Sequence, residues 1–170
     1  MARANSSWTA CIRRTHTRSV SLVSFEAKFE RECEELIAAL PDWFGIPESN
    51  ASYLRNLGAL PSWVALKEGA VVGAAALEES LPGSLEIHFM AVHPSCHRQG
   101  IGRRLEENLE VEARRRGGRW LHVKTLASSH PDPFYARTRA FYSALGFTPL
   151  FESSLFWGPE NPAVVLVKAL

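Results

Sequence analysis

A glycine pair at the start of a helix stands near the centre of the chain, in AVHPSCHRQGIGRRLEENLE at residues 91–110. The segment begins like a strand, turns at Pro94, and then places apolar residues at every fourth position from Ile101, as a helix does. Gly100 and Gly102 carry no Cβ, so another molecule can approach the backbone amides there. Because a helix N-terminus carries a partial positive charge, the segment predicts an anion site. A plain helix-start turn with solvated arginines is the alternative interpretation.

Two common phosphate-binding patterns do not fit this segment. The loop G-x-x-x-x-G-K-[ST] is absent from the chain. The dinucleotide pattern G-x-G-x-x-G fails at its third glycine, which is Leu105, and Pro94 interrupts its strand-to-helix turn. The remaining hypothesis is a pyrophosphate held by helix amides, with Arg98, Arg103 and Arg104 adding positive charge beside it.

The periodicity of the whole chain predicts a mixed α/β sheet with helices packed on it. Strand-like and helix-like segments follow one another in the order β-α-α-β-β-β-α-β-α-β-β, without an internal repeat. We therefore expect about seven strands, about four helices and a single domain over residues 18–170. The strands are expected within 18–25, 62–79 (a hairpin around 67–69), 84–92, 119–126, 147–157 and 163–170, and the helices within 25–40, 42–61, 99–116 and 135–145.

Composition bounds the class of protein. With 46% hydrophobic residues and a formal net charge of +1, the chain reads as a soluble domain without a general affinity for nucleic acid or acidic membranes. The basic run at residues 114–119 stands at a helix end, where cations suit the dipole. Three widely spaced cysteines favour a reducing compartment. We expect a cytoplasmic monomer or homodimer with no nucleic-acid and no membrane partner.

Residues 1–17 differ from the rest of the chain. They are rich in arginine, serine and threonine, and no acidic residue occurs before Glu26. No apolar stretch follows, so a secretory signal is not expected, whereas a transit leader and a disordered extension both remain open. We expect these residues to lie outside the domain.

Two motifs resemble the GNAT family of N-acetyltransferases. VHPSCHRQGIGRRL resembles its acyl-CoA signature, V-x-P followed by R/Q-x-x-G-x-G/A, and RAFYSALGF resembles its later F-Y-x-x-x-G-F segment. The resemblance covers Ser62 to Leu170, and residues 18–61 match only in general layout. It implies the GNAT acyl-CoA N-acyltransferase fold and an acetyltransferase that uses acetyl-CoA and releases coenzyme A. The implied reaction is direct transfer to a primary amine of a small molecule in a ternary complex. A protein or peptide acceptor, and a non-catalytic acyl-CoA-binding module, are the alternatives.

The resemblance also assigns a cofactor site. Backbone at residues 90–92 would pair with the pantetheine arm as an added strand, and amides at 98–103 would hold the pyrophosphate. His97 stands where the family has Arg or Gln, and Tyr135 stands where an asparagine is often found. The residues expected to bind the cofactor are Met90, Ala91, Val92, His97, Arg98, Gln99, Gly100, Ile101, Gly102, Arg103, Tyr135 and Tyr142.

The strand SLEIHFMAV offers candidates for proton transfer. Strict alternation would place Leu85, Ile87, Phe89 and Ala91 on one face and Glu86, His88, Met90 and Val92 on the other. Charged groups on a central strand need partners or a wet cleft, so both a catalytic pair and a salt-bridged rim fit this pattern. Glu86 also stands where some family members have a strand glutamate as general base. We expect Glu86, and after it His88, to take the proton from the amine.

The remaining candidates concern the leaving group and the acceptor. Tyr142 matches the tyrosine often credited as general acid toward the departing sulfur, and a packed helix tyrosine is the alternative. His93, Cys96 and His97 stand too close around Pro94 for a metal site, so no metal is expected. Aromatic and histidine side chains in the predicted loops and second helix could contact the acceptor or simply anchor those segments: Trp43, Phe44, Tyr53, His130 and Trp157.

Overall fold

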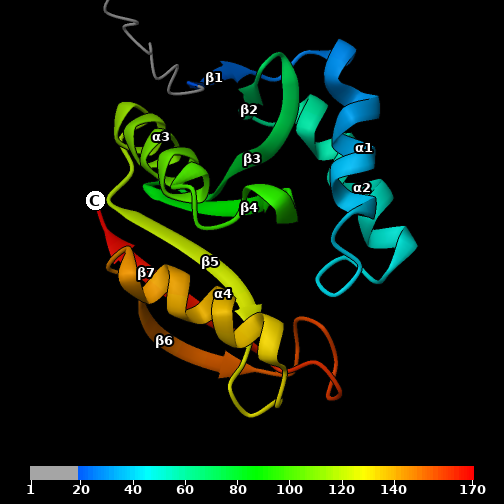
Figure 1. Ribbon diagram of the computed structural model, residues 1–170. Coiled ribbons are helices and arrows are strands. Elements are labelled where there is room, and N and C mark those ends of the chain that lie inside the picture. The colour runs from blue at the N-terminus through cyan, green and yellow to red at the C-terminus, as the bar shows by residue number, and fades with distance from the viewer. Residues whose placement is uncertain (1–18) are drawn as a thin grey trace, which may run out of the picture.

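A seven-stranded sheet in the order β1-β2-β3-β4-β5-β7-β6 runs through the molecule (Figure 1). The computed structural model describes residues 19–170, so the expectation for residues 1–17 lies outside the described part. The predicted element order is confirmed, and every neighbouring strand pair is antiparallel except β4 with β5. The strands are β1 (Val20–Ser24), β2 (Ser62–Lys67), β3 (Ala70–Leu81), β4 (Ser84–Val92), β5 (Trp120–Leu126), β6 (Thr148–Ser153) and β7 (Ala163–Ala169), and the helices are α1 (Glu30–Ala38), α2 (Pro47–Ala59), α3 (Ile101–Arg115) and α4 (Pro133–Ala144).

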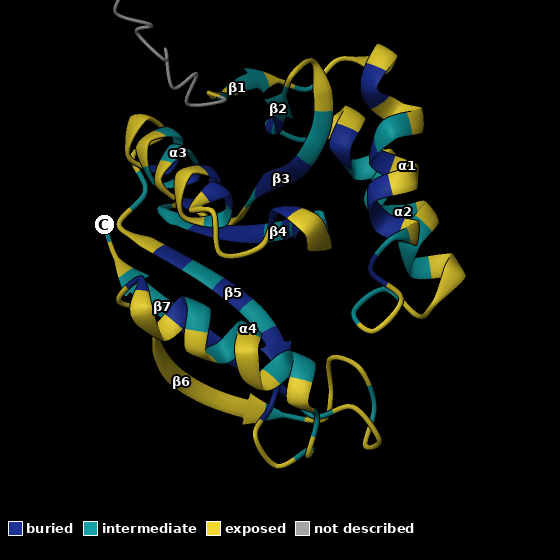
Figure 2. Ribbon diagram, in the orientation of Figure 1, coloured by how far each residue is buried: buried dark blue, intermediate teal, exposed yellow. Residues whose placement is uncertain are grey.

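Two apolar cores lie on opposite faces of this sheet, and Figure 2 shows the buried stripes of helix and strand that form them. On one face, α1 packs Cys33, Leu36 and Ile37 near the alanines of β3, whose small side chains let the helix approach closely. On the other face, α3 buries the apolar positions that recur from Ile101. None of the helices that the structure describes is both long enough and apolar enough to span a bilayer.

A β-bulge in β4 corrects the predicted alternation. Ala76 of β3 pairs with Phe89 and Leu77 with Ile87, so His88 is an extra residue without a partner of its own. The extra residue reverses the faces: Ile87 joins the core under α3, whereas Phe89 joins the core under α1 and α2. The prediction of one wholly apolar face was therefore wrong beyond the bulge, because side chains alternate only in an uninterrupted ladder.

Parallel strands β4 and β5 separate soon after they start. Only Ser84, Leu85 and Glu86 pair across to β5, at residues 120–122. Both strands continue, and Figure 1 shows them diverging, with β4 toward α2 and β5 beneath α4. No described strand pairs with residues 87–92 on the β5 side, so that backbone edge lines an opening in the middle of the sheet.

Candidate functional site

The start of α3 stands beside the opening between β4 and β5 and presents unpaired amides. Gly100 is the residue before the helix, and no side chain caps it. The first amide that donates within the helix is that of Arg104, to the carbonyl oxygen of Gly100. The amides of residues 100–103 therefore have no helical acceptor, and the helix dipole adds positive potential there. This geometry suits an anionic oxygen.

Glycine is favoured at positions 100 and 102 for different structural reasons. Gly100 has φ +79°, and a Cβ placed on it would meet no atom within 4 Å. Glycine is favoured there by its left-handed backbone and leaves the approach to the amides open. A Cβ on Gly102 would instead lie 3.2 Å from the ring of Phe141. The lack of a side chain at Gly102 thus lets α3 and α4 pack closely, and the contact of its amide with a bound anion stays a prediction.

Some side chains around this loop form hydrogen bonds that hold the loop in place. Gln99 accepts from Lys67 at 2.8 Å and donates to the Ser95 carbonyl, and Arg104 donates to the carbonyl of Val20. His97 Nε2 lies 2.7 Å from the Val92 carbonyl oxygen, so its ring turns back onto the end of β4.

Two exposed arginines at the loop remain available. Among the described residues, Arg98 and Arg103 have no hydrogen-bond or ion-pair partner. Arg98 also holds a positive φ of 62°, which is uncommon for a residue with a side chain. These two arginines are the cations best placed to meet an anion at the helix start.

A second group of polar residues lies on the α2 side of the bulge. His88 Nδ1 is 2.8 Å from a carboxylate oxygen of Glu78 on β3, and His88 Nε2 is 2.7 Å from the side-chain amide of Asn56 on α2. The ring of Tyr53 packs against the imidazole at a centroid distance of 5.9 Å. Both ring nitrogens are therefore held, and the side chain keeps about a fifth of its surface exposed.

Glu86 lies next to this group but has a different partner. Its two carboxylate oxygens lie 2.9 and 3.0 Å from the ammonium of Lys124 on β5, and Ser80 approaches one of them at 3.5 Å. Its side chain is only 9% exposed. His122, beside Lys124 on the same face of β5, has its pKa lowered, first because of burial and also because of the Lys124 ammonium, against the opposing effect of Glu86.

Tyr142 lies in the core on the other side of the sheet. It is 4% exposed and packs edge-on against the rings of Phe141 and Phe147. Burial raises its pKa strongly, and the carboxylate of Glu106 adds to the rise. The phenol therefore keeps its proton at any ordinary pH, which is compatible with a hydrogen-bond or proton donor and excludes a base.

The residues expected to contact an acceptor do not gather in one place. Tyr53 lies at the His88 group, and Phe44 packs on Phe89 in the core beneath it. Trp43 instead spans to α4: its indole donates to Thr138 at 3.0 Å, its carbonyl accepts from Tyr135, and its ring meets His97. His130 and Trp157 make no described contact with this group; a buried ring nitrogen of His130 has no partner.

The hydroxyl of Tyr135 is thus engaged with the loop between α1 and α2. Its pKa is raised to about 12 by burial, with smaller contributions from Tyr53 and Asp132. It holds Trp43 in the place where the resemblance suggested a contact with the pantetheine arm. A contact of Tyr135 with a bound cofactor stays a prediction.

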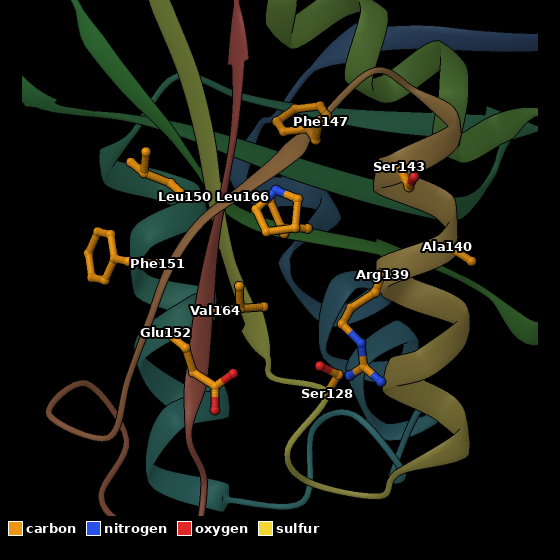
Figure 3. A pocket seen from close by; sticks show the side chains of 11 residues that line it. Ser128, Arg139, Ala140, Ser143, Phe147, Leu150, Phe151, Glu152, Val164 and Leu166 are labelled. Atoms are coloured by element: carbon orange, nitrogen blue, oxygen red, sulfur yellow. The ribbon is translucent and has the colours of Figure 1, made fainter.

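A hollow of about 430 Å³ lies away from these groups, between α4 and β6 (Figure 3). Arg139 lines it, but that guanidinium donates to the carbonyl oxygens of Leu126 and Ala127 and so braces the end of β5. None of the residues that line the hollow belongs to the helix start of α3 or to the His88 group. We therefore assign it no part in the candidate site.

Several site residues were missed by sequence reasoning. Glu78, Asn56 and Lys124 were not predicted, because the predicted hairpin joins β2 to β3 and gives no register between β3 and β4 or between β4 and β5. Thr125 on β5 is 2% exposed, and its hydroxyl has no partner among the described residues. Phe156 lies over the Lys124 ammonium at 5.4 Å and brings the β6–β7 loop to the same site.

Comparison with known proteins gives a consistent result. Residues 60–149 match the model of the acetyltransferase (GNAT) domain. The ribosomal-protein-S18-alanine N-acetyltransferase from Escherichia coli superposes with a TM-score of 0.71 at 21% identity, covering 89% of this chain and 94% of that one. A GNAT acetyltransferase from Staphylococcus aureus gives 0.74 at 16%, covering 89% and 99%. An aminoglycoside 6'-N-acetyltransferase complexed with coenzyme A gives 0.70 at 18%, covering 88% and 96%.

Proposed function

Because the chain belongs to the GNAT acetyltransferase family, we propose that it transfers the acetyl group of acetyl-CoA to a primary amine of a small molecule, by direct attack in a ternary complex. The observation that carries this proposal is the opening between β4 and β5 beside the uncapped start of α3. One feature offers free backbone groups to an extended amide chain, and the other offers amides to a pyrophosphate. The two lie on consecutive segments of the chain.

The residues present fit acetyl-CoA. The amides of residues 98–103, with Arg98 and Arg103, would hold the pyrophosphate. The free edge of β4, at Met90 to Val92, would pair with the pantetheine arm as an added strand. An N–H of the same edge would polarise the thioester carbonyl.

The side chains around Glu86 and His88 on β4 favour a cationic acceptor. Glu78 and Glu86 bring two carboxylates to this side of β4, and within residues 19–170 Lys124 is the one lysine or arginine that contacts either of them. The rings of Tyr53 and Phe156 border the group from α2 and from the β6–β7 loop. Carboxylates bordered by aromatic rings suit a small amine that enters as an ammonium and must lose a proton before attack.

Thiol release from acetyl-CoA, measured across a panel of amines, tests the proposal. The panel should include polyamines, aminoglycosides, amino acids and peptides with a free N-terminus. We expect turnover with a small-molecule amine and weaker or no turnover with peptides. If peptides are acetylated in preference to small amines, the acceptor is a protein or peptide, which contradicts the proposed small-molecule acceptor. Binding of acetyl-CoA without turnover on any amine would indicate a non-catalytic acyl-CoA-binding module and contradict the proposal.

Tyr142 is proposed to donate to the departing sulfur. Tyr142→Phe should lower kcat by about 10- to 150-fold, the worth of one hydrogen bond to a charged atom. Because the phenol keeps its proton far above neutral pH, the pH profile of the variant should keep the shape of the wild type. Phe141→Leu, next to it on α4, is the control for lost packing. An unchanged kcat in Tyr142→Phe would leave Tyr142 as a core residue only.

A further inference from the structure

We propose that the base of this reaction is His88 and that Glu78 on β3 positions it through the other ring nitrogen. The inference rests on the proposed acetyl transfer and names a positioning residue that the sequence pattern does not reveal. Its starting point is the bulge, which leaves His88 outside the pairing between β3 and β4. His88 is also two residues beyond Glu86, the last residue of β4 paired to β5, so it stands where the opening begins.

The contacts of the imidazole determine which nitrogen carries the proton. A carboxylate can only accept, so the 2.8 Å contact with Glu78 places a hydrogen on Nδ1. The amide of Asn56 donates to Nε2 at 2.7 Å, which requires a lone pair there. Neutral His88 therefore presents its basic nitrogen toward α2, where a single amide covers it. An incoming amine that replaces the Asn56 amide would meet a lone pair already oriented for proton transfer.

Glu86 is less suited to the same task. Both of its oxygens lie within hydrogen-bond distance of the Lys124 ammonium. To take a proton from an incoming ammonium, Glu86 must first give up that pair in a nearly closed site, with a side chain 9% exposed against 21% for His88. His88 needs to exchange only one neutral hydrogen bond.

The proton and electron pairs balance in this scheme. The acceptor ammonium gives one proton to His88 Nε2, and the resulting imidazolium faces the Glu78 carboxylate. The amine lone pair then forms the C–N bond with the thioester carbon. The C–S bond breaks, the thiolate accepts a hydrogen bond from Tyr142, and the second N–H proton passes to the sulfur, which leaves as the thiol of coenzyme A. His88 returns its proton to solvent.

The charged and titratable groups around His88 come from four elements. They are Tyr53 on α2, Glu78 on β3, Glu86 on β4 and the pair His122 and Lys124 on β5. Glu78 is the member of this group that contacts Nδ1, so it is the residue whose removal should act on the imidazole most directly.

The tautomer of His88 can be measured without turnover, and it tests the contact between Glu78 and Nδ1. Nitrogen-resolved NMR of the imidazole in the free protein should show hydrogen on Nδ1 and a bare Nε2 for His88. Glu78→Ala, which removes the acceptor at Nδ1, should shift the population toward the Nε2–H form, whereas Glu79→Ala, at the neighbouring exposed residue, should not. An Nε2–H tautomer in the wild type would overturn the role assigned to Glu78.

Steady-state kinetics with an amine that the protein acetylates test the catalytic role of His88 and the positioning role of Glu78. His88→Ala should lower kcat by about 10²–10⁴ while leaving the acetyl-CoA Kd unchanged, and added imidazole should restore part of the rate. Glu78→Gln should lower kcat at least about tenfold and move the ascending limb of kcat/KM to lower pH, because the imidazolium has lost its carboxylate. A merely structural contact would change the melting temperature but leave that limb in place.

The outcomes separate this inference from the proposed function. Lack of thiol release by the wild type on every amine contradicts acetyl transfer, while the NMR result still decides the tautomer. Turnover that survives in His88→Ala but is lost in Glu86→Gln overturns the assignment of the base. An unmoved pH limb in Glu78→Gln overturns the positioning role even if the rate falls.

Discussion

Gly100→Val is expected to weaken acetyl-CoA binding by at least about tenfold. The glycine adopts φ +79° immediately before α3, and the space where a Cβ would lie is empty. An isopropyl group there would stand over the amides of the first helical turn, where we propose the pyrophosphate binds. Isothermal titration of the folded variant with acetyl-CoA and with coenzyme A measures the loss, which should be equal for the two because both carry the pyrophosphate.

Gly117→Val is a matched control at the other end of α3. Gly117 has φ +80°, and a Cβ there would also meet no atom within 4 Å. Both variants therefore carry the same backbone strain of about 1–2 kcal/mol, but only Gly100 lies at the helix start. Gly117→Val should lower stability by as much as Gly100→Val and keep the affinity for acetyl-CoA. Equal losses of affinity in the two variants, or none in either, would remove the start of α3 from the cofactor site.

Local signals in the sequence were enough to predict the elements. The hairpin around residues 67–69, the helix after Gly100 and the long apolar strand before Pro94 depend on periodicity and turn residues, which a single chain displays directly. The two motifs added the family and with it the fold, and both are confirmed. Alternation along the same strand made Glu86 and His88 candidates for proton transfer, whereas Glu78, which contacts His88, was not predicted.

Non-local contacts could not be predicted. Nothing in SLEIHFMAV shows that its fifth residue, His88, is a bulge, because the extra residue is defined only by its pairing with Ala76 and Leu77. The partner of Glu86 depends on how far β4 and β5 run together, and that register joins segments more than thirty residues apart. Gly100 and Gly102 look alike in the sequence, and only the structure shows the positive φ of the first and the Phe141 ring beside the second.

Lys168→Met should destabilise the fold by about 3–5 kcal/mol at pH 8, the cost of leaving a buried charge unpaired. Glu106 on α3 is 1% exposed, and its carboxylate accepts from the Lys168 ammonium at 3.1 Å. The same ammonium contacts Glu110 at 2.5 Å. Methionine keeps much of the length and apolar volume of lysine but supplies no charge. Urea unfolding of variant and wild type at a series of pH values measures the difference.

The loss should shrink as the pH falls. Burial raises the pKa of Glu106, against the opposing effect of Lys168. A carboxyl whose pKa is raised on folding stabilises the protein below its unfolded pKa, and that contribution is lost as the pH rises through the folded pKa. Without Lys168 the folded pKa of Glu106 rises further, so the variant loses most stability above that pKa and regains it as the pH falls and Glu106 takes up a proton.

Glu106→Gln combined with Lys168→Met should return most of the lost stability, because a neutral amide at position 106 needs no cation. Arg31→Met, which removes the exposed pair with Glu35, should change the free energy of unfolding by less than about 1 kcal/mol. A loss in Lys168→Met that is the same at pH 5 and pH 8 would contradict the electrostatic account. It would show instead that the lysine stem stabilises the fold through its packing on Phe147, whose ring lies 5.6 Å from the ammonium.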